Sequence, residues 1–300
     1  MSKTIDKTKH TPSLYVVATP IGNLGDISLR AIQVLSEAKY IACEDTRTIK
    51  PLLQKYNIDT GKTFSYHKFN ETKSSDYIVQ LIQTQHCDIA LTSDAGTPCI
   101  NDPGALAVRA AREHGIPTIA IPGASATIAC MSISGLTGEW AFLGFVPKEN
   151  KKLRQVVDKI NNSQMQHYVF FESPKRILDT LKLLDTQFKD ASYFVCKELT
   201  KIYEYSTQGS FRQVYDDIEI NTVAEKGEYV LVISPNANHL QSSVKLEMSP
   251  QALIVQAMAE GKSIKDAIIL LTKSTPYSKN QLYNASLQLK KWFASPEICN

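Results

Sequence analysis

The sequence lacks a strong excess of charge of either sign. Its 33 lysines and arginines against 30 aspartates and glutamates leave a formal net charge of only +3 over 300 residues. Bulk attraction to nucleic acid or to an anionic membrane needs a larger excess, because it depends on the summed charge of the protein. Any anionic partner must therefore be held by a local group of basic side chains.

Cysteine is scarce and scattered. The six cysteines form no CxxC pair and no group with histidine at the spacing of zinc ligands. They are Cys43, Cys87, Cys99, Cys130, Cys196 and Cys299. We expect neither a metal site nor a disulfide framework, and interpret most of them as small buried side chains in a reducing compartment.

Several common catalytic signatures are also missing. The sequence contains no GxxxxGK[ST] loop, no GxGxxG after its first predicted strand, and neither HExxH nor GxSxG. Nucleotide hydrolysis, nicotinamide redox chemistry and serine hydrolysis therefore lose support as functions.

One uncharged stretch, from Gly115 to Gly138, is long enough to span a bilayer. Pro117 and Pro122 interrupt its apolar run, so we predict a strand, a turn and a helix of small residues within the core instead. Residues 1–12 are polar and lack the apolar segment of a signal peptide. We expect them to form a flexible tail, and the chain to be cytoplasmic.

Hydrophobic periodicity predicts an α/β fold. From residue 14 onward, short β-branched runs alternate with amphipathic stretches, which is typical of βαβ units and a largely parallel sheet, and Asp26 is the predicted cap of the first helix. Residues 203–209 are predicted to be extended and antiparallel to their neighbours. We divide the chain into a tail (1–12), an N-terminal α/β domain (13–122), a C-terminal α/β domain (123–236), a polar linker (235–243) and a helical domain resembling a helix-turn-helix (245–295).

The helical domain carries a local excess of positive charge. Residues 245–300 contain seven lysines against four acids, and three short helices are predicted at 250–259, 263–272 and 278–292. Lys279, Lys290 and Lys291 lie on or near the last helix, where they would either contact RNA phosphates or form the solvated face of a small packing module. The sequence leaves both interpretations open.

Three predicted strands end in unusual loops, ATPIGN (residues 18–23), EDTR (44–47) and SDAGTP (93–98). Ligands of open α/β sheets bind beyond the carboxyl ends of the strands, so these loops are expected to line one cleft. Each loop alone has an ordinary explanation as a turn or a surface salt-bridge cluster. Their recurrence at three strand ends favours a site.

In order and spacing, these loops and the later motifs resemble the ribosomal RNA small subunit methyltransferase I family, a branch of the tetrapyrrole methylase superfamily. The later motifs are PGAS (122–125), GFVP (144–147), FESPKR (171–176), KELTK (197–201) and KGE (226–228). The resemblance covers residues 13–235, and the three C-terminal helices resemble the family's accessory domain. Ala18 stands where the family usually has proline, which should affect only packing at the strand end.

The resemblance implies a two-domain class III methyltransferase, usually a homodimer, with S-adenosylmethionine between its domains. It also implies methyl transfer to the ribose 2′-hydroxyl of a cytidine in the decoding region of 16S rRNA, at position 1402, in naked rRNA or in the assembled small subunit. By motif, the donor would contact Pro20, Asp94, Ala95, Gly96, Thr97, Pro98, Ser125, Ala126 and Phe171.

Transfer to a hydroxyl needs positioning of the two reactants and a group that takes the proton. Asp45, Glu172 and Glu198 are the carboxylates proposed for this base, in no fixed order. The cations suited to RNA phosphates are Arg47, Lys175, Arg176 and Lys201. A structural ion-pair network is the alternative role for all of these charges. The chemistry requires no metal.

Two other functions remain to be weighed. A methylase of tetrapyrroles or other small molecules would need a deep apolar cleft without basic side chains at its rim, whereas basic residues stand on the motif loops here. A ribosome-assembly factor without enzymatic activity would not need an intact donor loop, yet Asp94 and Gly96 are both present.

Overall fold

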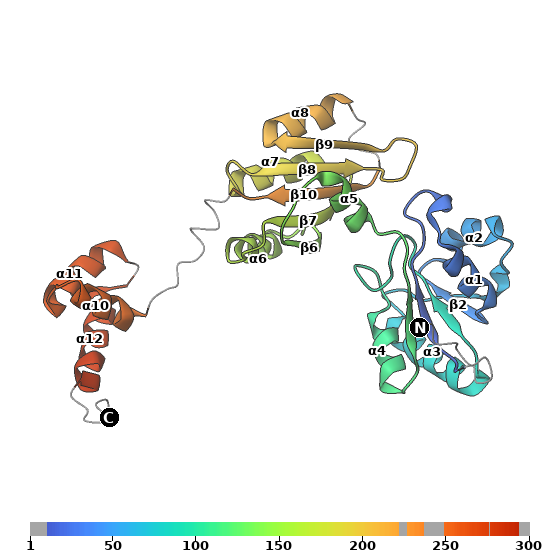
Figure 1. Ribbon diagram of the computed structural model, residues 1–300, viewed down its shortest axis with the longest axis horizontal. Coiled ribbons are helices and arrows are strands. Elements are labelled where there is room, and N and C mark those ends of the chain that lie inside the picture. The colour runs from blue at the N-terminus through green and yellow to red at the C-terminus, as the bar shows by residue number, and fades with distance from the viewer. Residues whose placement is uncertain (1–10, 222–226, 237–248, 276, 294–300) are drawn as a thin grey trace, which may run out of the picture. The chain divides into compact units, whose positions relative to one another are not determined.

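The computed structural model describes residues 11–221, 227–236, 249–275 and 277–293 (Figure 1). The chain separates into two compact units, residues 1–237 and residues 238–300. Most of the predicted tail and of the predicted linker (235–243) lies outside the described residues, as does Cys299.

The first sheet of the larger unit is entirely parallel. Its five strands are β1 (Leu14–Val17), β2 (Tyr40–Cys43), β3 (Thr63–Ser65), β4 (Ile89–Leu91) and β5 (Thr118–Ile121), in the order β3-β2-β4-β1-β5. The strands β1, β2 and β4, whose loops were predicted to form a site, are thus adjacent. All of their carboxyl ends lie at one edge of the sheet.

Four helices cover this sheet, two on each face (Figure 1). Apolar residues of α1 (Leu29–Glu37) and α2 (Thr46–Lys55) pack with Val17 and other residues on one face. Those of α3 (Glu71–Gln85) and α4 (Ala105–Glu113) pack on the other. Because both faces are covered, the central strands β2, β4 and β1 consist of apolar and aromatic residues, as expected of a parallel sheet.

The predicted cap of the first helix is wrong. Asp26 belongs to a short 3-10 turn, η1 (Leu24–Asp26), which Asn23 caps by accepting a hydrogen bond from the backbone N–H of Gly25. The helix α1 begins later, where the hydroxyl of Ser28 accepts the N–H of Ala31 at 3.1 Å. Asp26 and Ser28 are both residue types that commonly cap helices. Because Asp26 lies within the 3-10 turn, Ser28 is the residue that caps α1. A second 3-10 turn, η2 (Thr60–Lys62), precedes β3.

The second sheet is mostly antiparallel, so the predicted largely parallel sheet holds only for the first. Its strands are β6 (Trp140–Phe145), β7 (His167–Glu172), β8 (Ser192–Lys197), β9 (Tyr205–Ser210) and β10 (Tyr229–Ser234), in the order β6-β7-β10-β8-β9. Only β6 and β7 pair in parallel. The strand β9 confirms the predicted extended, antiparallel segment.

Helices also cover both faces of the second sheet. Residues of α6 (Asn150–Asn161), α7 (Ile177–Gln187) and α8 (Phe211–Asn221) share a core with one face, which includes Phe170 and Leu231. On the other face, α5 (Ala126–Ser134) packs through residues such as Cys130 against Val169, Phe194 and Cys196. The helix α5 therefore places its first residues close to the ends of this sheet.

The uncharged stretch Gly115 to Gly138 forms β5, a turn and α5, as predicted. In the part of the chain that the structure describes, none of the helices combines the length and the apolar character needed to cross a membrane.

The smaller unit contains the three predicted helices, α10 (Pro250–Ala259), α11 (Ile264–Ser274) and α12 (Lys279–Phe293). The hydroxyls of Ser249 and Ser263 cap the first two. The unit has its own core of eight buried residues, namely Ile254, Ala257, Ala267, Ile268, Leu271, Leu282, Ala285 and Leu289.

Candidate active site

The three predicted loops meet at the carboxyl edge of the first sheet. Thr19, after β1, and Gly96, after β4, exchange two backbone hydrogen bonds of 2.9 and 3.0 Å. The N–H of Asp45, after β2, donates to Oδ1 of Asp94 at 3.0 Å. Gly96 has φ of +78°, a backbone conformation that residues with a Cβ rarely adopt. The strand order and these bonds together hold the loops as one structure.

Loops of the second sheet approach the same edge. The hydroxyl of Thr97 donates to the carbonyl of Ala124 at 3.1 Å, and the N–H of Asn23 donates to the hydroxyl of Thr200 at 3.1 Å. A Cβ added at Gly22 would lie 2.5 Å from Cγ of Lys201, so the first loop can lie against the KELTK segment only because it carries a glycine. The two sheets of the larger unit are thus joined at this edge.

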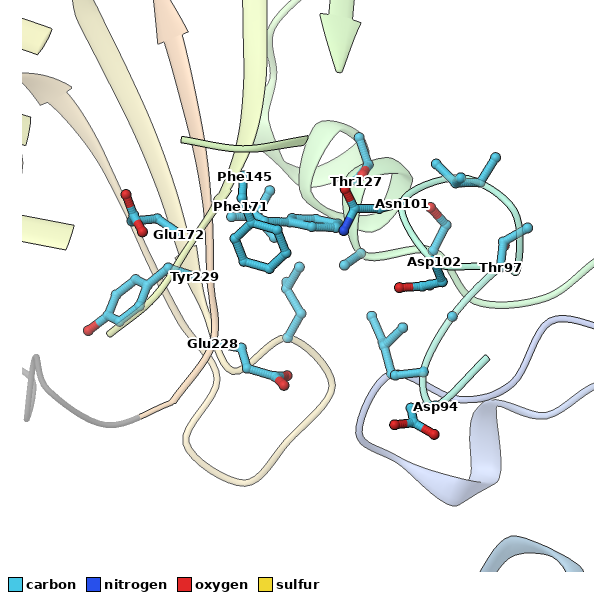
Figure 2. Close-up of a pocket in the computed structure, with 18 of the residues that line it drawn as sticks. Asp94, Thr97, Asn101, Asp102, Thr127, Phe145, Phe171, Glu172, Glu228 and Tyr229 are labelled. Carbon is cyan, nitrogen blue, oxygen red and sulfur yellow. The ribbon is translucent and has the colours of Figure 1, made fainter. Parts of the chain in front are cut away.

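A cavity of about 480 Å³ lies between these loops (Figure 2). That volume is in the range of pockets for small organic ligands. Its lining comes from both sheets and is formed by Ile21, Glu44, Asp94, Ala95, Gly96, Thr97, Ile100, Asn101, Asp102, Ser125, Ala126, Thr127, Phe145, Phe171, Glu172, Ser173, Pro174, Leu199, Gly227, Glu228, Tyr229 and Val230.

One side of the cavity is aromatic and aliphatic. The ring of Phe171 packs against Phe142 with centroids 4.8 Å apart and edge-on against Phe145 at 5.6 Å. Phe145 is 56% exposed, so much of its ring remains accessible at the cavity. Ile21 and Leu199 belong to the same apolar cluster. This side offers a surface for a flat or apolar part of a ligand.

The opposite side is acidic. Burial raises the pKa of Glu44, and the charges of Asp94 and Asp102 raise it further, against a lowering by His67. Burial likewise raises the pKa of Asp94 and of Asp102 above the usual value of an aspartate. Figure 2 shows Asp94 and Asp102 on the same side of the cavity. Such a cluster attracts a cationic group, because each carboxylate is destabilised by its neighbours.

Among the described residues, no hydrogen-bond donor contacts the carboxylates of Glu44 and Asp102. Asp94, by contrast, accepts the Asp45 N–H. Two carboxylates of the cavity are therefore available to a ligand. The imidazole of His67 has a buried Nδ1 atom with no partner among the described residues.

The structure brings most of the predicted donor-binding residues together. Seven of them line the cavity, namely Asp94, Ala95, Gly96, Thr97, Ser125, Ala126 and Phe171. Pro20 and Pro98 lie in the same loops but outside the lining. Their role in donor binding stays a prediction.

The predicted catalytic carboxylates have other partners. Glu172 is fully buried, and its oxygens accept the N–H of Ser173 and the hydroxyl of Thr180, both at 2.6 Å, and lie 3.3 Å from Nη1 of Arg176. Glu172 belongs to the cavity lining, but Figure 2 shows its carboxylate directed away from Asp94 and Asp102. This arrangement anchors the start of α7 to the end of β7.

Asp45 and Glu198 lie outside the cavity lining. Hydrogen bonds from the side chain and backbone of Arg47 lower the pKa of Asp45 to about 2, and its carboxylate caps α2. Glu198 has φ of +54° and accepts both Nζ of Lys201 and the N–H of Glu228 at 2.9 Å. Both carboxylates stabilise the loops that surround the cavity.

The predicted RNA-binding cations fall into two groups. Arg47 and Lys175 are exposed, although Arg47 also pairs with Asp45 at 2.6 Å. Arg176 donates to the carbonyls of Val146 and Pro147, and Lys201 bridges Glu198 and Glu228, so both hold the structure in place. In the smaller unit Lys279 and Lys290 are exposed, while the side chain of Lys291 lies outside the described residues.

Sequence reasoning missed several residues of the lining, including Glu44, Asn101, Asp102, Phe145 and Glu228. Glu44, Phe145 and Glu228 stand inside recognised motifs, and Asn101 and Asp102 lie in the segment that follows SDAGTP. Only their partners distinguish these residues from their neighbours. The signal that was available was position, since Glu44 follows β2, Phe145 ends β6 and Glu228 precedes β10.

Comparison with known proteins gives two kinds of similarity. Residues 13–215 match the family model described as Tetrapyrrole (Corrin/Porphyrin) Methylases. The chain is 40% identical over 232 residues to a ribosomal RNA small subunit methyltransferase I from Hydrogenobaculum sp., covering 77% of this chain and 99% of that protein. It is 38% identical over 276 residues to the protein of the same name from Halalkalibacterium halodurans, covering 91% and 93%.

The fold is also that of a solved protein. A uroporphyrin-III C-methyl transferase from Thermus thermophilus, complexed with S-adenyl homocysteine, matches with a TM-score of 0.52 and 16% identity, covering 74% of this chain and 97% of that one. At this identity the similarity establishes the α/β fold of the larger unit.

Proposed function

Because the chain belongs to the ribosomal RNA small subunit methyltransferase I family within the tetrapyrrole methylases, we propose that it transfers a methyl group from S-adenosylmethionine to ribosomal RNA. The proposed acceptor is the ribose 2′-hydroxyl of cytidine 1402 in 16S rRNA. The observation that carries this proposal is the cavity, because the motif loops shared with the family converge on it from both sheets.

The cavity fits the proposed donor in size and in chemistry. S-adenosylmethionine combines a flat adenine, a positively charged sulfonium, and an amino acid end with an ammonium and a carboxylate. The aromatic side at Phe171 suits the adenine, and Asp94 and Asp102 on the acidic side suit the two cationic groups. The cofactor supplies an activated methyl group on its sulfonium.

Backbone groups of two loops would hold this donor. Ala95 and Gly96 have little or no side chain, which lets the main chain approach the ligand closely. Ser125, Ala126 and Thr127 line the cavity at the start of α5, where no side chain caps the helix. The first N–H groups of α5 are then free to donate to an anionic group such as the donor's carboxylate.

We propose Glu44 as the group that takes the proton from the ribose hydroxyl. Its carboxylate lines the cavity, and its raised pKa makes it a stronger base than an ordinary glutamate. The Asp45 carboxylate, with a pKa of about 2, is a weak base, and Glu172 and Glu198 are engaged by neighbouring groups. We therefore assign positioning roles to those three residues.

RNA would be held outside the cavity by exposed cations. Arg47 and Lys175 are proposed to contact phosphates near the site, and Lys279, Lys290 and Lys291 to contact RNA from the smaller unit. We further propose that the assembled small subunit is the substrate. The enzyme is proposed to work as a homodimer in the cytoplasm. The proposed domain boundaries lie at residues 122–123 and 236–245.

The acidic lining argues against a tetrapyrrole substrate. Porphyrin-type substrates carry several carboxylates, which Glu44, Asp94, Asp102 and Glu228 would repel at the cavity. A ribose hydroxyl is uncharged, and the phosphates of its strand can remain outside. RNA therefore suits this cavity better as the methyl acceptor than a tetrapyrrole does.

Calorimetric titration with S-adenosylmethionine tests the proposal at its first step. We expect one site per chain, with binding weakened by an Asp94→Asn substitution. Absence of donor binding by the folded wild-type protein would contradict a methyltransferase and favour an assembly factor. Donor binding combined with transfer to a small molecule but not to RNA would favour the tetrapyrrole-type reaction.

A further inference from the structure

A group of exposed basic side chains lies immediately beyond the cavity on the second sheet. We call it the α6 basic surface and define it by Lys148, Lys151, Lys152, Arg154 and Lys175, all of which are exposed. Four of these cations fall within seven consecutive residues, at the start of α6. None of the four belongs to the motifs that place the donor.

The surface is tied to the cavity by short chain connections. Phe145 lines the cavity, and Lys148 follows it by three residues, so their Cα atoms are at most about 11 Å apart. Pro174 also lines the cavity and directly precedes Lys175. The guanidinium of Arg176 donates to the carbonyls of Val146 and Pro147 at 3.0 and 3.3 Å, which fixes these two connections side by side.

Packing of α6 keeps the cations in solvent. Leu153, Val157 and Ile160 form the buried stripe of the helix, at the spacing of one helical face. By the same periodicity Lys151 lies opposite that stripe and Arg154 lies on its flank. These side chains therefore project into solvent and do not pack in the hydrophobic core.

Little negative charge offsets the surface. Its nearby acids are Glu149, which pairs with Lys152 at 2.9 Å with both side chains mostly exposed, and Asp158, which lies one turn after Arg154 on α6. Such an exposed pair contributes little and is easily exchanged for another partner. Among the described residues, Lys148, Lys151, Arg154 and Lys175 make no ion pair. Phe145, whose side chain is more than half exposed, lines the cavity three residues before Lys148.

We propose that the α6 basic surface binds the phosphates of the nucleotides that flank the reacting ribose, with Phe145 offering its free face to a neighbouring base. Proteins bind single-stranded nucleic acid with cations placed along its phosphate backbone and with aromatic side chains on which its bases stack. This inference rests on the proposed function. It adds a surface, on a helix that no motif includes, which guides RNA to the cavity.

The test compares two double variants that each remove two positive charges. Lys151→Gln with Arg154→Gln alters the surface. Lys39→Gln with Lys189→Gln is the matched control, because these exposed residues precede β2 and β8 and so lie at the opposite edges of the sheets. Binding of a 16S rRNA decoding-region fragment is measured over a series of salt concentrations, together with donor affinity and methyl transfer.

We expect the surface variant to bind RNA on the order of tenfold more weakly than the control at physiological salt. Its plot of log affinity against log salt should be shallower by about 0.7 for each lost phosphate contact. Donor affinity should be equal in both variants, which also shows that both are folded. A second pair, Lys148→Gln with Lys152→Gln, should reproduce the effect.

Equal RNA affinity and equal salt dependence in the surface and control variants would overturn the inference while leaving the proposed function intact. Equal affinity for RNA fragments with weakened binding of whole subunits would also overturn it, since the surface would then contact ribosomal protein. Failure of the wild-type protein to bind or methylate any RNA would overturn the proposed function and this inference together.

Discussion

The backbone N–H of Asp45 donates a 3.0 Å hydrogen bond to Oδ1 of Asp94. The carboxylate of Asp45 meanwhile accepts the backbone N–H of Arg47 at 2.8 Å and so begins α2. One residue therefore uses its main chain to join the loops after β2 and β4 and its side chain to start a helix. Glu44, immediately before it, is placed in the cavity by this arrangement.

The first prediction concerns the donor loop. Gly96 has φ of +78°, and a Cβ there would lie 3.3 Å from the side chain of Ile21 in the cavity wall. Gly96→Val should strain the loop and raise the dissociation constant of S-adenosylmethionine at least tenfold, as measured by calorimetry.

Gly115→Val is the matched control, because Gly115 has φ of +69° and open space around its Cβ position. It lies outside the cavity lining and imposes similar backbone strain. Wild-type donor affinity in a folded Gly96→Val protein would refute the assignment of the loop.

The second prediction concerns the base. Glu44→Gln should lower kcat by a factor of about 10² to 10⁴ while leaving donor affinity near wild type, because an amide cannot take the hydroxyl proton. Single-turnover transfer to small subunits measures the effect. A loss below threefold would exclude Glu44 from this role.

The pH dependence tests the same residue independently. Glu44 acts deprotonated, and its pKa is raised above the ordinary 4.5, so the rate should rise with pH through a value above 4.5. Asp102 contributes to that increase, so Asp102→Asn should move the acidic limb to lower pH. If the acidic limb of the Asp102→Asn profile did not move, or if this variant lost as much kcat as Glu44→Gln, Asp102 would be indicated as the base instead.

The third prediction separates stability from catalysis at Glu172. Glu172→Ala leaves Thr180 and Arg176 without their buried partner and should lower the free energy of unfolding by about 3 kcal/mol, measured by chemical denaturation. Glu172→Gln keeps the shape of the side chain and one hydrogen-bond acceptor, so it should lower the free energy of unfolding by less.

In folded Glu172→Gln protein, kcat should stay within tenfold of wild type. A drop of two or more orders of magnitude with unchanged stability would restore Glu172 as a candidate for the base.

The fourth prediction concerns the smaller unit. Because α10, α11 and α12 have a core of their own, deletion of residues 245–300 should leave the larger unit folded. RNA affinity and its salt dependence should fall, whereas donor affinity should not. Equal loss of both affinities would show that the helices serve the fold of the donor site instead of RNA binding.

Four of the five strands of the first sheet could be predicted from the sequence, because they are short apolar runs that follow the βαβ pattern. The strand β3, with the sequence TFS, was not predicted. The antiparallel pairing of the second sheet could not. The strands β7, β8 and β10 are apolar on both faces, with β10 buried along nearly its whole length, so alternation gives no sign of strand direction.

The members of the site were predicted well as loops and poorly as individual carboxylates. The position of Asp94 to Thr97 follows from their place directly after a predicted parallel strand, where ligands of open α/β sheets bind. The chemical availability of Glu172 depends on Thr180, one helix away, and that of Glu198 on Lys201 and Glu228. Such pairings arise only on folding, so a motif cannot tell a free carboxylate from an engaged one.

The most direct test of the central claim is transfer of tritium from labelled S-adenosylmethionine to small ribosomal subunits purified from cells that lack the endogenous enzyme, followed by mapping of the modified nucleotide. The proposed function predicts label on one ribose 2′-oxygen, at the decoding-region cytidine. Absence of label on subunits and on naked 16S rRNA, from protein that binds the donor, would contradict it.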